Sequence, residues 1–160
     1  MLRIRDLADA AVVGLVSEYG LSMQRIPDGL SISGSFWGEP EAGVVGDCIY
    51  VRDDTPVHSL LHEMSHVICM TPQRRKSLKG DAGGDDLEEC AVCYLQIVLV
   101  DRLAGTDRNR LMQDMDGWGY SFRLGSTQAW FESDADDARA WLTEHGLVTA
   151  ADNPAFVLRT

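Results

Sequence analysis

The sequence is poor in basic residues. Its 160 residues contain 14 Lys and Arg against 25 Asp and Glu, which gives a formal net charge of −11 at pH 7. Nucleic-acid binding depends on Lys and Arg side chains that neutralise phosphates, so we expect no direct binding to nucleic acid. The one basic cluster, between Arg74 and Lys79, is interpreted as a solvated loop, with a docking patch for an acidic partner as the alternative.

Long hydrophobic runs are also absent. The longest strongly apolar run, Ala91 to Val100, has about half of the ~20 residues that a membrane-spanning helix needs. The first residues, Met1 to Asp6, are charged and do not resemble a secretory signal. We therefore expect a cytoplasmic protein that does not enter a membrane.

Cysteine is scarce, and the four cysteines fall in apolar stretches. In a reducing compartment each of them is expected to be a small buried side chain. Hydrophobic residues make up 45% of the chain and charged residues 24%, and the chain contains no repeats. This composition predicts one folded domain over residues 1–160, with a core large enough to need no disulfides.

The hydrophobic pattern predicts an α+β fold. Apolar positions recur at helical spacing over residues 3–19, and β-like segments at 30–33 and 47–51 predict two or three antiparallel strands. Further helices are predicted from Pro56 to about Thr71, from about 86 to 103, and from 134 to 145. The helix at 86–103 is apolar on nearly every side, which predicts that it is the most buried element.

The most informative feature is the motif His62-Glu63-Met64-Ser65-His66 inside an apolar helix. Residues four apart lie on one face of a helix, so His62 and His66 can present two imidazole nitrogens to one Zn²⁺. Glu63 lies beside them as a potential general base. This H-E-x-x-H pattern predicts a zinc-dependent peptidase that acts on a peptide or protein substrate. It does not indicate an oligomeric state.

A third zinc ligand is expected outside the motif, because a catalytic zinc usually has three protein ligands. A His six residues after His66 is excluded, since Pro72 occupies that position. A carboxylate on the next helix remains. Glu88 shares a helical stripe with Ala91, which is small enough to permit close approach of the motif helix, whereas Glu89 lies on a slightly more polar stripe. We therefore expect Glu88 as the ligand, with Glu89 as the alternative.

Four other residues are less favourable candidates for the third ligand. Asp85 and Asp86 open the helix, where their charges complement the helix dipole. His58 lies one turn before His62, but three consecutive turns of a straight helix cannot easily surround a tetrahedral ion, so it is expected on the surface or next to a ligand. His145 ends a helix, where an imidazole is favourable for dipole reasons alone.

Two non-catalytic alternatives remain open. Cys90 and Cys93, together with His62 and His66, have the donor set of a structural Cys₂His₂ zinc site. Glu63 argues against this interpretation, because a closed structural site has no use for a carboxylate beside the metal. The other alternative is a regulatory or interaction protein that keeps a peptidase scaffold without catalysis.

The sequence resembles the ImmA/IrrE family of gluzincin metallopeptidases over about residues 45–100. In that family the third ligand opens a Glu-x-x-Ala pattern on the helix after the motif, and Glu88-Glu89-Cys90-Ala91 fits this pattern. The chain departs from the usual motif at Ser65, where relatives usually have Gly. The resemblance implies a zincin-like domain, in which a small antiparallel or mixed sheet packs against the motif helix and a buried helix follows.

The resemblance also implies the roles of the site residues. His62, His66 and Glu88 would hold the zinc, and Glu63 would be the catalytic base. A repressor-cleaving regulator of this kind often carries a DNA-binding module, but no basic recognition helix is evident here. By analogy, the segment from Cys48 to Arg52 would lie beside the cleft and pair with an extended substrate. The candidates for stabilising the oxyanion are Tyr50, Tyr94 and Tyr120.

Overall fold

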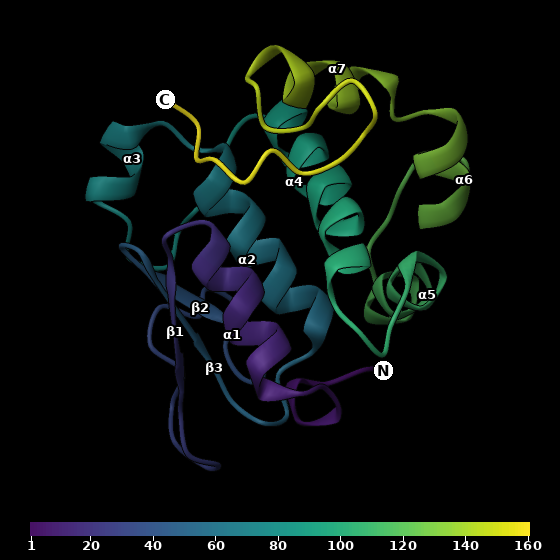
Figure 1. Ribbon diagram of the computed structural model, residues 1–160. Helices are drawn as coiled ribbons and strands as arrows, with labels where there is room; N and C mark the ends of the chain where they lie inside the picture. The colour runs from purple at the N-terminus through teal and green to yellow at the C-terminus, as the bar shows by residue number, and fades with distance from the viewer.

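Two helices, α2 (Val57–Cys69) and α4 (Asp86–Leu99), run through the middle of the molecule. A computed structural model describes residues 1–160 (Figure 1). The other elements, in chain order, are η1 (Ile4–Asp6), α1 (Asp9–Glu18), β1 (Ser22–Arg25), β2 (Gly43–Val45), β3 (Cys48–Val51), α3 (Pro72–Lys76), η2 (Val100–Arg102), α5 (Arg108–Trp118), α6 (Thr127–Ser133) and α7 (Asp136–Glu144). The sheet and α1 lie on one side of α2, and α4 lies on the other (Figure 1). The predicted α+β class is therefore confirmed.

The sheet is small and mixed. Its strand order is β1-β3-β2, with β3 parallel to β1 and antiparallel to β2. The strand predicted at 47–51 is confirmed as β3, but the strand predicted at 30–33 is a turn in which the Ile32 amide donates to the Glu39 side chain at 2.8 Å. The strand β1 was not predicted because its residues, Ser22 to Arg25, are mostly polar and exposed and lack an apolar alternation.

The strand predicted to pair with a substrate lies in the middle of the sheet. The central strand β3 uses its backbone groups for both neighbours. The outer edge of β2 is covered as well, because the Val44 amide donates to the Gly34 carbonyl at 3.3 Å and the Gly80 amide donates to the Val44 carbonyl at 2.8 Å. The expectation that residues 48–52 bind an extended substrate by backbone pairing is therefore wrong.

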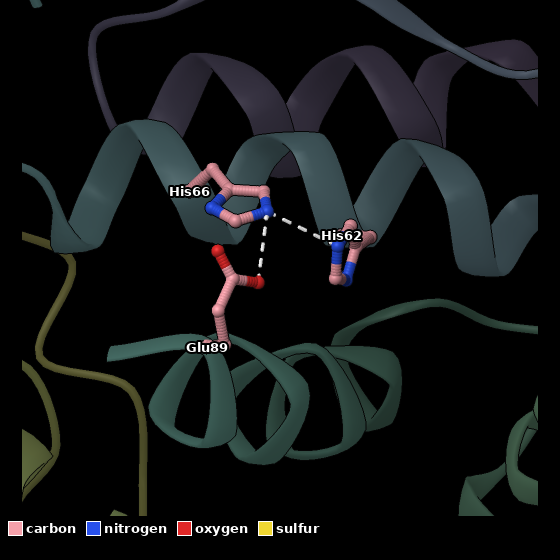
Figure 2. A group of neighbouring side chains, drawn as sticks. All are labelled: His62, His66 and Glu89. Atoms are coloured by element: carbon pink, nitrogen blue, oxygen red, sulfur yellow. Dashed lines mark hydrogen bonds and ion pairs between the residues drawn. The ribbon is translucent and has the colours of Figure 1, made fainter. Parts of the chain in front are cut away.

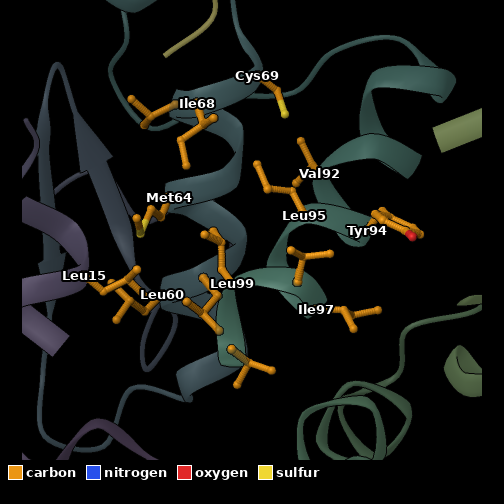
Figure 3. Close-up of a cluster of buried hydrophobic side chains, with 14 of the residues drawn as sticks. Leu15, Leu60, Met64, Ile68, Cys69, Val92, Tyr94, Leu95, Ile97 and Leu99 are labelled. Carbon is orange, nitrogen blue, oxygen red and sulfur yellow. The ribbon is translucent and has the colours of Figure 1, made fainter. Parts of the chain in front are cut away.

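The predicted helices carrying the motif and the buried run are both present, as α2 and as α4 followed by η2. Nearly all of α2 is buried. A single core cluster joins these helices to the sheet, to α1 and to α7, and Figure 3 shows Leu60 and Met64 of α2 in the same cluster as Val92 and Leu95 of α4. The last predicted helix begins later than expected, because residues 127–133 form the separate helix α6. None of the helices combines the length and apolar character needed to cross a bilayer.

Close backbone packing beside β2 requires glycine at position 43. A Cβ atom there would lie 2.0 Å from the Ser33 carbonyl oxygen and 2.5 Å from the Ser35 nitrogen. These contacts involve backbone atoms, which cannot move aside as the end of a side chain can. The segment that leads to Phe36 and Trp37 is therefore held against the sheet by the absence of a side chain.

We predict that Gly43→Ala lowers the free energy of unfolding by about 2 kcal/mol or more, because the added methyl group overlaps the backbone of residues 33–35. Urea unfolding measures this change. The matched control is Gly14→Ala in α1, where a Cβ atom meets nothing within 4 Å; this change should stabilise the protein by roughly 0.5–1 kcal/mol. Equal stability of Gly43→Ala and the unaltered protein would contradict the packing described.

Candidate metal centre

Two histidines of α2 and one glutamate of α4 converge on one point. His62 and His66 project from the same face of α2, with their Nε2 atoms 3.1 Å apart. Glu89, in the first turn of α4, places its Oε2 atom 3.6 Å from Nε2 of His66. One donor atom from each residue lies within 4.8 Å of the others, and Figure 2 shows the three side chains facing one another across the gap between the helices. The structure thus contains a possible metal site of His62, His66 and Glu89.

The spacing of these donor atoms suits a small metal ion. Zinc binds imidazole nitrogen and carboxylate oxygen at about 2.0–2.1 Å, so two ligands at tetrahedral corners are roughly 3.3 Å apart. The distances of 3.1 Å between the imidazoles and 3.6 Å from His66 to Glu89 bracket this value. Two nitrogens and one carboxylate also leave one corner of a tetrahedron without a protein ligand, which is the pattern of catalytic sites.

Gln96 orients the first of the histidines. Its Oε1 atom lies 2.7 Å from Nδ1 of His62, so Nδ1 carries the proton and donates it, and Nε2 keeps its lone pair toward His66 and Glu89. Gln96 is fully buried. It was not predicted, although a signal existed: Gln96 is the polar residue within an apolar run and lies two turns after Glu89 on the same face of α4.

Both imidazoles are held in the neutral form that binds metals. Burial lowers the pKa of His62, although the Gln96 hydrogen bond acts in the opposite direction. Burial also lowers the pKa of His66 to about 2, and the charges of His62 and Arg74 add to this effect. Because a protonated imidazole cannot bind a metal, these low pKa values mean that the two histidines need no deprotonation near neutral pH.

Glu88, the expected third ligand, is occupied elsewhere. Its two carboxylate oxygens accept hydrogen bonds from Arg74 Nη1 at 2.7 and 2.8 Å, and Arg159 approaches to 3.7 Å. Adjacent residues point about 100° apart on a helix, so Glu88 and Glu89 cannot both face α2. The structure brings Glu89 rather than Glu88 to the histidines. The helical pattern of residues 86–103 contains no information about Arg74 of α3, so the ion pair with Glu88 could not be predicted from it.

The Glu88 ion pair also shapes the loop before α4. Arg74 Nη2 donates to the carbonyl oxygens of Ala82 and Gly83 at 3.1 and 2.9 Å. The Gly84 amide in turn donates to Oε1 of Glu89 at 2.8 Å, which leaves Oε2 directed at His66. Glu88 therefore contributes to the site by holding Arg74, and through it the loop that orients Glu89.

Glu63 lines the same cavity as the three candidate ligands. This cavity of about 240 Å³ is also bordered by Phe36, Trp37 and the loop 80–83. Glu63 is buried, and its Oε2 atom has no hydrogen-bond partner within the protein. Burial, assisted by the charges of Glu41 and Glu89, raises the pKa of Glu63 to about 8. A carboxyl group whose pKa lies near neutrality can both accept and return a proton.

The other residues that the sequence offered as metal ligands lie outside the His62, His66 and Glu89 cluster. His58 is buried beside the rings of Trp118 and Tyr120, at 5.2 and 5.5 Å between centroids, and does not join the cluster. Asp85 caps α4 by accepting from the Glu88 amide. The remaining candidates also lie outside the cluster: Asp86, Cys90, Cys93 and His145. The Cys₂His₂ arrangement is therefore not formed.

Of the three tyrosines considered, one lies beside the candidate ligands. The ring centroid of Tyr120 is 5.8 Å from that of His62. Burial raises the pKa of Tyr120 well above its ordinary value, so its hydroxyl stays protonated and able to donate. Tyr94 instead donates to Asp152 at 2.8 Å. The structure therefore favours Tyr120 as the hydroxyl donor near the cluster.

Comparison of the chain with protein-family models, with curated proteins and with solved structures gives no match. The site is thus defined by its geometry: a His-His-Glu cluster, with a buried carboxylate in the same cavity, in an α+β fold.

We predict that Glu89→Gln weakens zinc binding by more than about 100-fold, because a neutral amide is a poor substitute for a carboxylate ligand. Glu88→Gln is the matched control on the adjacent residue. It should lower the melting temperature, because Arg74 loses its charged partner, while it changes zinc affinity by less than about 10-fold. Competition with a chelating dye measures both affinities. Retention of zinc by Glu89→Gln and its loss from Glu88→Gln would reverse the assignment.

A second prediction concerns the metal-free protein. The pKa of Glu63 in the folded state, about 8, lies above its ordinary value of 4.5. Its contribution to stability is therefore fully present below about pH 4.5 and is lost as the pH rises to about 8. Glu63→Gln removes this titration and should be more stable than the unaltered protein by roughly 2–4 kcal/mol at pH 8. Near pH 4.5 this advantage should disappear.

Urea unfolding in the presence of a chelator, at pH 5 and pH 8, measures this difference. The buried histidines are common to both proteins, so their titration cancels in the comparison. A difference in stability that is independent of pH would contradict a buried, unpaired carboxylate at this position.

Proposed function

We propose that the protein is a zinc-dependent peptidase of the gluzincin type, built on a zincin-like domain and acting on a peptide or protein substrate. One observation carries this proposal: His62, His66 and Glu89 converge in a cavity that also contains the buried carboxylate of Glu63. The residues present fit zinc in donor type and in spacing, as argued above. The role that the family pattern implies for Glu88 passes to Glu89 in this proposal.

The division of roles follows from the contacts. His62, His66 and Glu89 would hold the ion, and Gln96 would keep His62 in the correct tautomer. A bound Zn²⁺ supplies a Lewis acid that polarises the scissile carbonyl and acidifies a water molecule. A closed structural site would have no need for Glu63, so the buried carboxylate favours hydrolysis over a purely structural role.

Glu63 is the proton carrier in the proposed reaction. It would accept a proton from the attacking water and deliver it to the leaving amine, as a general base and then a general acid. Tyr120 lies on the His62 side of the site and keeps its hydroxyl proton. In the proposed reaction its hydroxyl, which lies 3.5 Å from Nδ1 of His58, would turn to donate a hydrogen bond to the negative charge that develops on the carbonyl oxygen.

We predict that Glu63→Gln retains zinc and lowers peptide cleavage by about 100-fold or more, because the proton carrier is lost while the ligands remain. Mass spectrometry of a broad peptide library, with zinc content measured on the same samples, tests this. Glu18→Gln, a surface change on α1, is the control and should cleave like the unaltered protein. Equal cleavage by all three proteins would show a contaminating protease. A zinc-loaded protein that cleaves nothing would favour the regulatory alternative.

A further inference from the structure

A second pocket opens beside the candidate metal site. Its volume is about 370 Å³, and it shares Trp37, His62 and Glu89 with the metal cavity. Two further aromatic side chains, one carboxylate and a glycine form the rest of its lining: Trp118, Tyr120, Glu41 and Gly119. A group bound in this pocket would therefore lie next to the atoms that the metal contacts.

The end of α5 places two of these aromatic side chains. Trp118 is the last residue of the helix, and Gly119 follows with a φ of 112°, in the left-handed region that favours glycine. The chain reverses there, and Tyr120 returns toward His62, with 5.8 Å between the ring centroids. The helix end thus presents one ring on each side of the turn to the pocket.

The carboxylate in the pocket is fixed in direction. Trp118 Nε1 donates a hydrogen bond to Oε1 of Glu41 at 3.0 Å, and Oε2 of Glu41 makes no hydrogen bond within the protein. Trp37, on the opposite segment, is 78% exposed and leaves its ring available for contact. Aromatic faces next to an oriented carboxylate form an arrangement that attracts a cation by both its charge and the ring quadrupoles.

The charge of the two cavities also favours a cationic ligand. The two cavities are lined by four carboxylates, those of Glu41, Glu63, Asp81 and Glu89, and by no Lys or Arg. A Zn²⁺ ion would offset two of the three carboxylate charges that line its own cavity, those of Glu63, Asp81 and Glu89. Glu41, the carboxylate that lines only the second pocket, then remains without a counter-charge. A substrate carrying positive charge would be attracted to this surface, and an acidic one would be repelled.

We infer that the pocket of Trp37, Glu41, Trp118 and Tyr120 binds the cationic side chain of a Lys or Arg residue next to the scissile bond. This inference rests on the proposed function, because the pocket acts as a specificity site only if the neighbouring centre holds zinc and cleaves peptides. Glu41 is the residue that selects the cation, and the aromatic rings contact the alkyl stem and the charged end.

The test compares three probes that differ in the side chain alone: the hydroxamates of Nα-acetyl-lysine, Nα-acetyl-norleucine and Nα-acetyl-glutamate. In each probe the hydroxamate anchors the molecule to zinc, so differences in affinity report the side-chain pocket. Calorimetric titration of the zinc-loaded protein should show the lysine compound binding roughly 10-fold more tightly than the norleucine compound. The glutamate compound should bind most weakly.

Two matched variants locate the selecting carboxylate. Glu41→Gln should reduce the preference for lysine over norleucine to about 2-fold or less, because the oriented charge is gone. Asp81→Asn removes one charge from the metal cavity but none from the pocket of Glu41, so this variant should keep the preference for lysine over norleucine. The melting temperature of each variant establishes that it is folded, and the preference in the unaltered protein tests the inference without any variant.

The outcomes separate this inference from the proposed function. Equal binding of the lysine and norleucine compounds to zinc-loaded protein overturns the pocket assignment and leaves the peptidase proposal standing. So does loss of the preference in Asp81→Asn with its retention in Glu41→Gln. A purified protein that takes up no zinc overturns both proposals together.

Discussion

The hydrophobic packing of α2 against α4 holds the candidate metal centre in place. Val92 and Leu95 of α4 are fully buried, and so is Cys69 of α2, which lies on the side of α2 that faces them (Figure 3). Burial of such side chains stabilises the contact by roughly 1.5–3 kcal/mol for each large residue and leaves little freedom for the helices to slide. The relative position of the two helices also sets the positions of the polar side chains that they carry. The packing of the two helices therefore brings the donor atoms of His62, His66 and Glu89 together, and no strong polar network is needed to do so.

Glu88 and Glu89 are adjacent on α4 but have different roles, since Glu88 forms a structural ion pair and Glu89 is a candidate metal ligand. Glu88 is buried against Arg74, and loss of Arg74 would leave a buried carboxylate with only the more distant Arg159 as its partner. Glu89 is half exposed and faces the histidines. Arg74 links the two roles, because it also holds the loop whose Gly84 amide orients the Glu89 carboxylate. A side chain outside the donor set thus decides where a donor points.

The charged and polar groups of the site destabilise the metal-free protein. A buried carboxylate without a hydrogen-bond partner on Oε2, as in Glu63, opposes folding of the metal-free protein near neutral pH. Two neutral imidazoles lie beside it with their Nε2 atoms at close range. A bound divalent cation would accept the imidazole lone pairs and would attract the carboxylate charge, so it would stabilise both features. Local violations of folding rules of this kind are expected at functional sites.

The sequence by itself determined the features that depend on local periodicity. The spacing of His62 and His66, the helix around them and the second buried helix follow from residues that are near one another along the chain, where helical geometry leaves few alternatives. The α+β class follows in the same way. Only the tertiary structure decided between Glu88 and Glu89 and brought Gln96 and Tyr120 to His62, because the rotation of α4 and the path after α5 depend on contacts between distant segments. The same reason explains the position of β3 in the middle of the sheet, since strand pairing is a long-range choice that a strand's own residues do not encode.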